Sequence, residues 1–213
     1  MQEGPELIQL FPTPLFIGKY SRDMSKELEF IKNLEYRECG AAEHKGDVLN
    51  RQSKETFLFD YEELSEIGRF CRLHLDYYVE NVLQCKDKLF ITQCWANITG
   101  KGERHHEHSH PNSIISGVFY FQNNSKLPPI QFRRKEVREF QLDVAKHNNF
   151  NSSTYLLPAD SGELLLFPST LQHSVLNNQS DEDRISIAFN TFSKGSLGSI
   201  ESLTYLPIDR CKE

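Results

Sequence analysis

The sequence predicts a mainly β protein, a jelly roll whose sheets are buttressed by N-terminal α-helices. Two observations carry this prediction. In the first third of the 213-residue chain, apolar residues recur every three or four positions, which is the helical period. After Lys88 the pattern changes to short β-rich runs separated by polar turns. Long helices followed by many short strands are typical of a β-sandwich or jelly roll supported by helices.

Two helices are expected before Lys88. The first begins at Ser25 and its pattern ends at Cys39-Gly40; the second runs from about Tyr61 to about Leu83. Each carries an apolar stripe on one face, which favours packing against a sheet.

The clearest strands follow Lys88. They are Leu89–Ile98, Ile114–Gln122, Ile130–Arg133, Glu163–Phe167 and Arg184–Phe192. The segment from Ser125 to Ala159 is the least regular, and its Asn-rich tract predicts a long loop, where substrate lids tend to lie. We expect one domain over residues 1–213, with helical support in 1–87, a β core in 88–195 and a C-terminal tail in 196–213.

Composition excludes several function classes. The net charge is −6 and no Lys/Arg stripe is present, so nucleic-acid binding is not favoured. The five cysteines are scattered with no C-x-x-C pair, which suits a reducing compartment better than a disulfide scaffold. No apolar run approaches the ~20 residues needed to cross a bilayer, and the first residues lack a signal-peptide pattern. We therefore expect a cytoplasmic protein without a membrane partner.

Four of the eight histidines lie in one stretch of six residues: His105, His106, His108 and His110. On an extended strand, residues i and i+2 point to the same side, so His108-x-His110 presents two imidazoles to one metal ion. His173, just after a compact apolar strand, is placed to supply a third ligand. Taken alone, a histidine-rich patch fits a solvated loop or an adventitious metal binder equally well.

Glycines precede both histidine segments at matching distances. Gly102 is followed by five residues and then His108-Ser109-His110, and Gly162 is followed by five residues, then Pro168 and later His173. This spacing resembles the paired motifs of the cupin superfamily. Two features depart from those motifs: Thr170 replaces a glycine, and no glutamate follows the H-x-H pair at the usual distance. The resemblance implies a double-stranded β-helix that brings three histidines to one ion. Cupins and 2-oxoglutarate oxygenases share this barrel, so the motifs indicate fold and metal but not chemistry.

Arg184 lies eleven residues after His173 and opens a strand that alternates cleanly. Arg184 and Ser186 share one face of it, opposite Ile185 and Ile187. An arginine beside the last metal ligand can bind a carboxylate through two parallel charge-assisted hydrogen bonds, and a serine hydroxyl can add a third. This geometry suits the distal carboxylate of 2-oxoglutarate. The competing interpretation is an exposed strand face with an ordinary arginine.

Here the resemblance becomes specific. A branch of the 2-oxoglutarate/iron(II)-dependent oxygenases found in bacteria and their phages is similar in several stretches. These are Trp95-Ala-Asn97, His108-Ser-His110-Pro-Asn112-Ser113, Ser116-Gly117-Val118-Phe119-Tyr120, and Phe167-Pro168-Ser169 with His173 and Arg184-Ile-Ser186. The likeness covers nearly the whole chain and implies His108, His110 and His173 as ligands of Fe(II), with Arg184 binding the cosubstrate 2-oxoglutarate.

One departure from the superfamily pattern is large. The pattern is H-x-D/E…H…R/K, whereas His110 stands here in the carboxylate's position, which makes the site one charge more positive. An alternative is that His105-His106-Glu107 supplies an H-x-E pair; it ranks second because His108 and His110 have the cupin-like spacing.

Supporting residues follow from strand alternation. Gln93, Trp95 and Asn97 share a face, so Asn97 is a candidate to hydrogen-bond the cosubstrate and Trp95 to line the pocket, core packing being the alternative for Trp95. Tyr120 is a further candidate, since its hydroxyl could reach 2-oxoglutarate.

The predicted function is a 2-oxoglutarate- and Fe(II)-dependent dioxygenase that uses O2, hydroxylates a C–H bond and releases succinate and CO2. The substrate cannot be read from the sequence; the related prolyl hydroxylases suggest a peptide or protein. Two alternatives remain open: a cupin-type three-histidine dioxygenase that does not use 2-oxoglutarate, and a non-enzymatic metal-binding module.

Overall fold

The computed structural model describes residues 6–39, 49–122, 126–135 and 142–208. Its helical segments are α1 (Ser25–Lys32), η1 (Leu58–Asp60), η2 (Glu62–Leu64), α2 (Ser65–Tyr77) and the π-helical turn η3 (Tyr78–Val82). Its strands are β1 (Phe16–Lys19), β2 (Tyr36–Glu38), β3 (Arg51–Ser53), β4 (Leu89–Thr99), β5 (His105–His108), β6 (Ile115–Tyr120), β7 (Ile130–Arg133), β8 (Thr154–Leu157), β9 (Glu163–Pro168), β10 (Gln172–Val175), β11 (Arg184–Ser193), β12 (Ser196–Leu197) and β13 (Leu206–Pro207).

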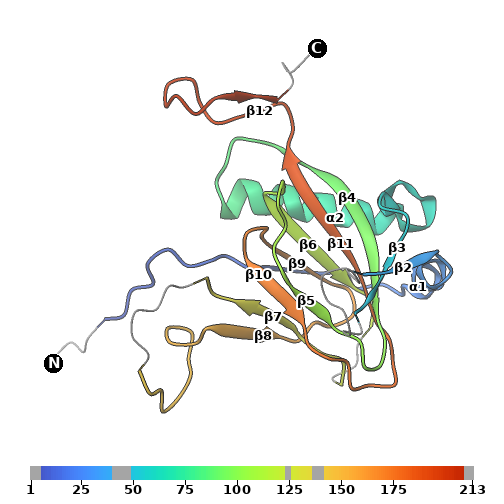
Figure 1. The fold of residues 1–213 in the computed structure, drawn as a ribbon. Helices are drawn as coiled ribbons and strands as arrows, with labels where there is room; N and C mark the ends of the chain where they lie inside the picture. Colours follow the sequence, from blue (N-terminus) through green and yellow to red (C-terminus); the bar gives the residue numbers. More distant parts are fainter. Residues whose placement is uncertain (1–5, 40–48, 123–125, 136–141, 209–213) are drawn as a thin grey trace.

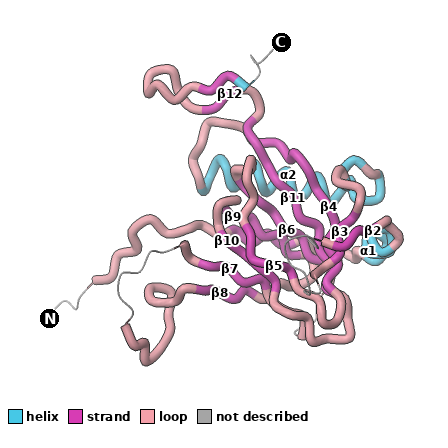
Figure 2. The backbone as a smooth tube through the Cα atoms, viewed as in Figure 1, coloured by secondary structure: helices cyan, strands magenta, loops and turns pink. Residues whose placement is uncertain are grey.

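Most strands of the described ranges form two facing sheets (Figures 1 and 2). The larger sheet has seven strands in the order β1-β9-β6-β11-β4-β3-β2, and the smaller has four in the order β5-β10-β7-β8. Neighbours within both sheets are antiparallel. This arrangement confirms the predicted mainly β fold, a double-stranded β-helix supported by N-terminal helices. The short β12–β13 hairpin extends away from the two sheets (Figure 1).

The first 87 residues supply strands as well as helices. β1 pairs with β9 at one edge of the larger sheet, and β3 pairs with β4 near the other edge. The sequence predicts only helical support there, because strands of three or four residues are too short to show a period of two. The predicted helix from Tyr61 to Leu83 is present as η2, α2 and η3 in succession. The first helix ends at Lys32, earlier than its apolar pattern indicated, because the chain turns into β2.

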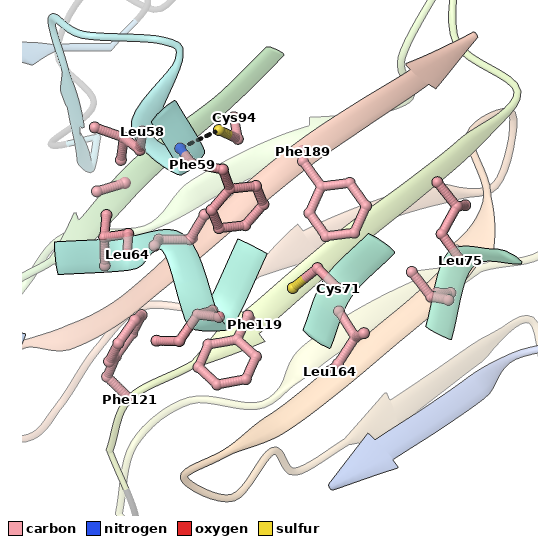
Figure 3. Close-up of a cluster of buried hydrophobic side chains, with 14 of the residues drawn as sticks. Leu58, Phe59, Leu64, Cys71, Leu75, Cys94, Phe119, Phe121, Leu164 and Phe189 are labelled. Carbon is pink, nitrogen blue, oxygen red and sulfur yellow. Dashed lines mark hydrogen bonds between the residues drawn. The ribbon is translucent and has the colours of Figure 1, made fainter. Parts of the chain in front are cut away.

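The larger sheet buries its outer face under α2. On β11, Ile185, Ile187 and Phe189 face this side and are essentially inaccessible to solvent. Figure 3 shows the Phe189 ring beside Phe59 and Cys71, between the helix and the strands. The alternation predicted for β11 is therefore present. Because the side chains of Ile185, Ile187 and Phe189 pack toward the helix, the side chains at the even positions of β11 point into the space between the sheets.

The predicted strands agree with the observed ones to within two residues at each end. The segment from Ser125 to Ala159, expected to be a loop, contains β7 and β8, which pair with each other in the smaller sheet. Ser125 and residues 136–141 of that segment lie outside the described residues. None of the helices in the described ranges is long and apolar enough to cross a membrane.

Gly162→Ala is expected to destabilise the protein far more than Gly102→Ala, although both glycines have positive φ, +78° and +80°. A Cβ on Gly162 would lie 2.1 Å from the carbonyl oxygen of Tyr20, whereas a Cβ on Gly102 meets nothing within 4 Å. Gly102→Ala should cost only the left-handed backbone penalty of about 1–2 kcal/mol, and Gly162→Ala roughly 3 kcal/mol or more. Urea unfolding of both variants measures the difference; equal losses would contradict the close approach of β1 to this turn.

Candidate metal centre

Three histidines from two distant segments converge at the mouth of the barrel. His108 ends β5, His110 follows two residues later, and His173 lies on β10, where its Cα is paired in register with that of His108. One ring nitrogen from each lies within 4.8 Å of the other two. In the described residues this is the one group of three or more His, Cys, Asp or Glu side chains that could hold a metal ion. The sequence-predicted triad is therefore brought together.

Hydrogen bonds to Nδ1 fix the tautomers of two of these rings. His108 Nδ1 lies 2.9 Å from the backbone oxygen of His106, and His173 Nδ1 lies 2.9 Å from that of Leu171. A carbonyl oxygen can only accept, so both Nδ1 atoms carry a proton. A neutral ring then has an unprotonated Nε2, which is the form that binds a metal ion.

Burial keeps the rings neutral. Desolvation, reinforced by the neighbouring imidazole of His108, lowers the pKa of His110 to about 4 and that of His173 to about 3. Burial also lowers the pKa of His108. At neutral pH all three rings therefore retain a free lone pair.

The spacing of the ligand atoms fits a metal ion. His108 Nε2 and His110 Nε2 are 3.0 Å apart. Two nitrogens each ~2.1 Å from one ion, at a right angle, would lie ~3.0 Å apart. His108 carries its proton on Nδ1, so its Nε2 offers a lone pair toward His110 Nε2, which is free to bind the same ion when the proton of the His110 ring is on Nδ1. The geometry of the triad thus fits a bound metal ion.

Ser169 connects the segment that contains His110 to the segment that contains His173. Its backbone oxygen accepts a hydrogen bond from the amide of His110 at 2.9 Å, and its amide donates to the oxygen of Ile114 at 3.0 Å. The loop carrying His110 is therefore attached to the turn that leads into β10 and His173. Because these hydrogen bonds are made by the backbone, they hold the ligands together without using a side chain of the triad.

The alternative H-x-E pair does not form. Glu107 points to the other side of β5 and makes an ion pair with Arg133 Nε. The ring of His105 lies parallel to that of His108 with centroids 4.5 Å apart, and its Nδ1 is 3.5 Å from Asn50 Nδ2. His110, rather than Glu107, therefore stands with His108 and His173 in the structure.

The predicted cosubstrate residues share one row across the larger sheet. Asn97 of β4 is paired with Ser186 of β11, which is paired in turn with Tyr120 of β6. Partners in register point to the same side of a sheet, so all three face the barrel interior. All three are buried. Asn97 also accepts a hydrogen bond from Asn50 Nδ2 at 3.2 Å.

Arg184 opens the next row and is 6% exposed. Its guanidinium donates to the hydroxyl of Tyr120 at 3.2 Å, and Cζ lies 4.9 Å from the centre of the same ring. Burial raises the pKa of Tyr120, with Arg184 opposing this shift, so the phenol stays neutral and can accept. The ion pairs found in the described ranges do not include Arg184. A buried guanidinium without a carboxylate is costly, which indicates a site for an anionic ligand.

Two further buried polar atoms lack a protein partner on the barrel side of β4. Trp95 Nε1 and Thr99 Oγ1 are both buried and have no hydrogen-bond partner among the described residues. Trp95 also packs edge-on against His110, with ring centroids 6.0 Å apart. Trp95 lies at the histidine end of this strand and Thr99 is the register partner of Arg184, so a dicarboxylate bound between the two ends would reach both groups.

Some residues of the site carried no role in the sequence analysis. Ser116 contacts His110 directly, and Asn190 contacts Ser116. Asn50 contacts Asn97 and His105. Strand alternation could have indicated both Ser116 and Asn190, because Ser116 shares a face of β6 with Tyr120, and Asn190 shares a face of β11 with Arg184 and Ser186. Asn50 gave no signal, since it lies just outside a three-residue strand far from the motifs.

A family model matches residues 93–190 of the chain; the family is described as "Putative 2OG-Fe(II) oxygenase". Iron(II) and 2-oxoglutarate are the metal and cosubstrate typical of that family of oxidoreductases. No curated protein matches the sequence.

Solved structures with the same fold have very different sequences. The 2-oxoglutarate-dependent epimerase SnoN from nogalamycin biosynthesis is 9% identical, with a TM-score of 0.64, and 88% of this chain and 82% of that one are covered. HygX from Streptomyces hygroscopicus, solved with nickel, 2-oxoglutarate and hygromycin B, is 11% identical, with a TM-score of 0.59 and coverage of 84% and 82%. A prolyl-4-hydroxylase from Pseudomonas putida is 11% identical, with a TM-score of 0.58 and coverage of 84% and 92%. These likenesses show the fold.

Proposed function

We propose that this chain hydroxylates a C–H bond of its substrate with Fe(II), 2-oxoglutarate and dioxygen, because a model of the 2OG-Fe(II) oxygenase family matches its residues 93–190. One oxygen atom of O2 would enter succinate, the other would enter the hydroxyl group of the product, and CO2 would be released. One observation carries the proposal. The barrel combines three neutral histidines turned to a common point with a buried arginine that has no carboxylate partner among the described residues.

We assign the metal to His108, His110 and His173, each binding through Nε2. Held by these three nitrogens, an iron ion would supply the redox chemistry of the reaction. The protein contributes the tautomers, through the Nδ1 contacts, and the spacing of the two segments, through Ser169. With three neutral ligands, negative charge at this centre must come from the cosubstrate.

We assign the distal carboxylate of 2-oxoglutarate to Arg184. Its planar guanidinium suits bidentate binding, and the contact with Tyr120 holds it in place. Ser186 and Asn97 lie beside it and supply further polar groups. Val118, Leu165, Phe167 and Ala188 belong to the apolar cluster packed beside these polar groups, and this cluster limits the access of water to the site.

A peptide or protein is the substrate class that we propose to test first, on analogy with the prolyl-4-hydroxylase of the same fold. The analogy rests on fold alone, and HygX was solved with hygromycin B, a molecule of a different class.

A three-histidine dioxygenase that takes no 2-oxoglutarate is the second candidate. The all-histidine ligand set favours it. It leaves the buried Arg184 and the unsatisfied Trp95 Nε1 without a ligand, which is why we place it second. A non-enzymatic binding module would retain the metal but consume no 2-oxoglutarate.

An anaerobic titration of 2-oxoglutarate into Fe(II)-loaded and metal-free protein separates these candidates. We expect binding that requires the metal, with the visible charge-transfer absorption of a 2-oxo acid chelated to Fe(II). Glutarate, which keeps both carboxylates but lacks the keto group, is the control and should bind more weakly without this absorption. Metal binding with no response to 2-oxoglutarate would favour the second candidate.

A further inference from the structure

His110 differs from the other two histidines in the hydrogen-bond partner of its Nδ1 atom. His108 and His173 each donate to a backbone carbonyl, which accepts only. His110 Nδ1 instead lies 2.6 Å from the hydroxyl oxygen of Ser116. A hydroxyl can donate or accept, so Ser116 alone allows either tautomer of His110. If Ser116 donated to Nδ1, the proton of a neutral ring would lie on Nε2 and block metal binding.

The other contacts of Ser116 decide its direction. Its hydroxyl donates to Asn190 Oδ1 at 3.0 Å, and an amide oxygen only accepts. With its single proton directed to Asn190, Ser116 must accept from His110 Nδ1. Ser116 Oγ is also 2.8 Å from Ser169 Oγ, which in turn is 2.7 Å from Ser113 Oγ. Ser116 and Ser169 are completely buried, so water does not compete for these hydrogen bonds.

The position of this pair in the sheet supports the assignment. Ser116 of β6 and Asn190 of β11 are partners in register, and both face the interior immediately beside His110. All residues of β6 are buried and Ser116 is completely inaccessible to solvent, so its hydroxyl depends on protein partners. Trp95 packs on the His110 ring from β4 and restricts its rotation.

We propose that Asn190, acting through Ser116, is a positioning residue that fixes the metal-binding tautomer of His110. This inference rests on the proposed metal site and concerns the ligand that stands where the superfamily pattern has a carboxylate. A carboxylate needs no such partner, because it has no tautomers. A histidine in that place does, and the Ser116–Asn190 pair provides it from the neighbouring strands.

Co(II) binding to the full-length protein tests the proposal without any turnover, through the ligand-field absorption and a competition titration with a chelator. Ser116→Ala and Asn190→Leu should each weaken binding by about 10- to 100-fold, the range for outer partners of metal-bound histidines. Asn190→Asp, which can only accept, should bind at least as tightly as the wild type. Ser174→Ala is the matched control. Ser174 is a buried serine next to His173 whose hydroxyl instead contacts Gln131, 3.3 Å away, and its loss should change affinity less than about 3-fold.

The double variant Ser116→Ala/Asn190→Leu should bind no more weakly than the weaker single variant, because both act on one contact of His110. Additive losses would overturn the proposed order, as would unchanged affinity in both single variants. A failure of the metal site itself gives a different result. In that case neither the wild type nor His110→Ala would bind Co(II) tightly. That result would overturn the proposed metal site, and this inference with it.

Discussion

His173→Ala is expected to abolish 2-oxoglutarate turnover and to weaken metal binding by more than about 100-fold, beyond the effect of losing an outer partner. The reason is geometric. His173 is the sole ligand from β10, and without it His108 and His110 would hold the ion from one loop only. Metal affinity is measured by chelator competition, and turnover by succinate formation.

The control for this variant is His147→Ala, which removes an exposed histidine far from the triad in sequence. It should leave metal affinity and turnover unchanged. Circular dichroism and thermal unfolding of metal-free His173→Ala establish that the variant is folded. A folded variant that binds the metal as tightly as the wild type would remove His173 from the site.

Arg184→Met is expected to raise the dissociation constant of 2-oxoglutarate by about 30-fold to several thousand-fold, corresponding to the roughly 2–5 kcal/mol lost when one partner of a buried charge pair is truncated. Metal affinity should stay near the wild-type value, because Arg184 contacts Tyr120 and not the triad. Isothermal titration of 2-oxoglutarate into anaerobic, Fe(II)-loaded protein measures the change. Arg184→Lys should give an intermediate loss, since lysine keeps the charge but not the planar fork.

Although Arg184→Met weakens 2-oxoglutarate binding, it should not lower the free energy of unfolding. In the ligand-free protein Arg184 is buried without a carboxylate among the described residues, so a methionine of similar length should leave the stability unchanged or raise it. Arg37→Met, on the exposed part of β2, is the control and should affect neither quantity. A strongly destabilised Arg184→Met variant that still bound 2-oxoglutarate would make Arg184 a structural residue.

Much of the catalytic barrel could be predicted because alternation reports which side of a strand is buried. On β11, the apolar positions Ile185, Ile187 and Phe189 indicated one face, which placed Arg184 and Ser186 on the other. The spacing of His108 and His110 similarly indicated two imidazoles on one side of the chain, and their Nε2 atoms lie 3.0 Å apart in the structure.

The rest depended on contacts between distant segments. Nothing local in the sequence shows that β1 pairs with β9, or that Asn50 lies against Asn97. Pairing partners are chosen by the whole fold, and short strands carry too few residues to show a period. The choice between His110 and Glu107 was also non-local, because Arg133 on β7 forms the ion pair that holds Glu107 on the outside.

Succinate formation tests the central claim most directly. Protein loaded anaerobically with Fe(II) and 2-oxoglutarate is exposed to O2, and succinate and the 2-oxoglutarate consumed are both quantified. We predict one succinate for each 2-oxoglutarate consumed, dependent on Fe(II) and lost in His173→Ala and Arg184→Met. Tight Fe(II) binding by the triad with no consumption of 2-oxoglutarate, with or without a panel of peptide and small-molecule substrates, would contradict the assignment as a 2-oxoglutarate-dependent hydroxylase.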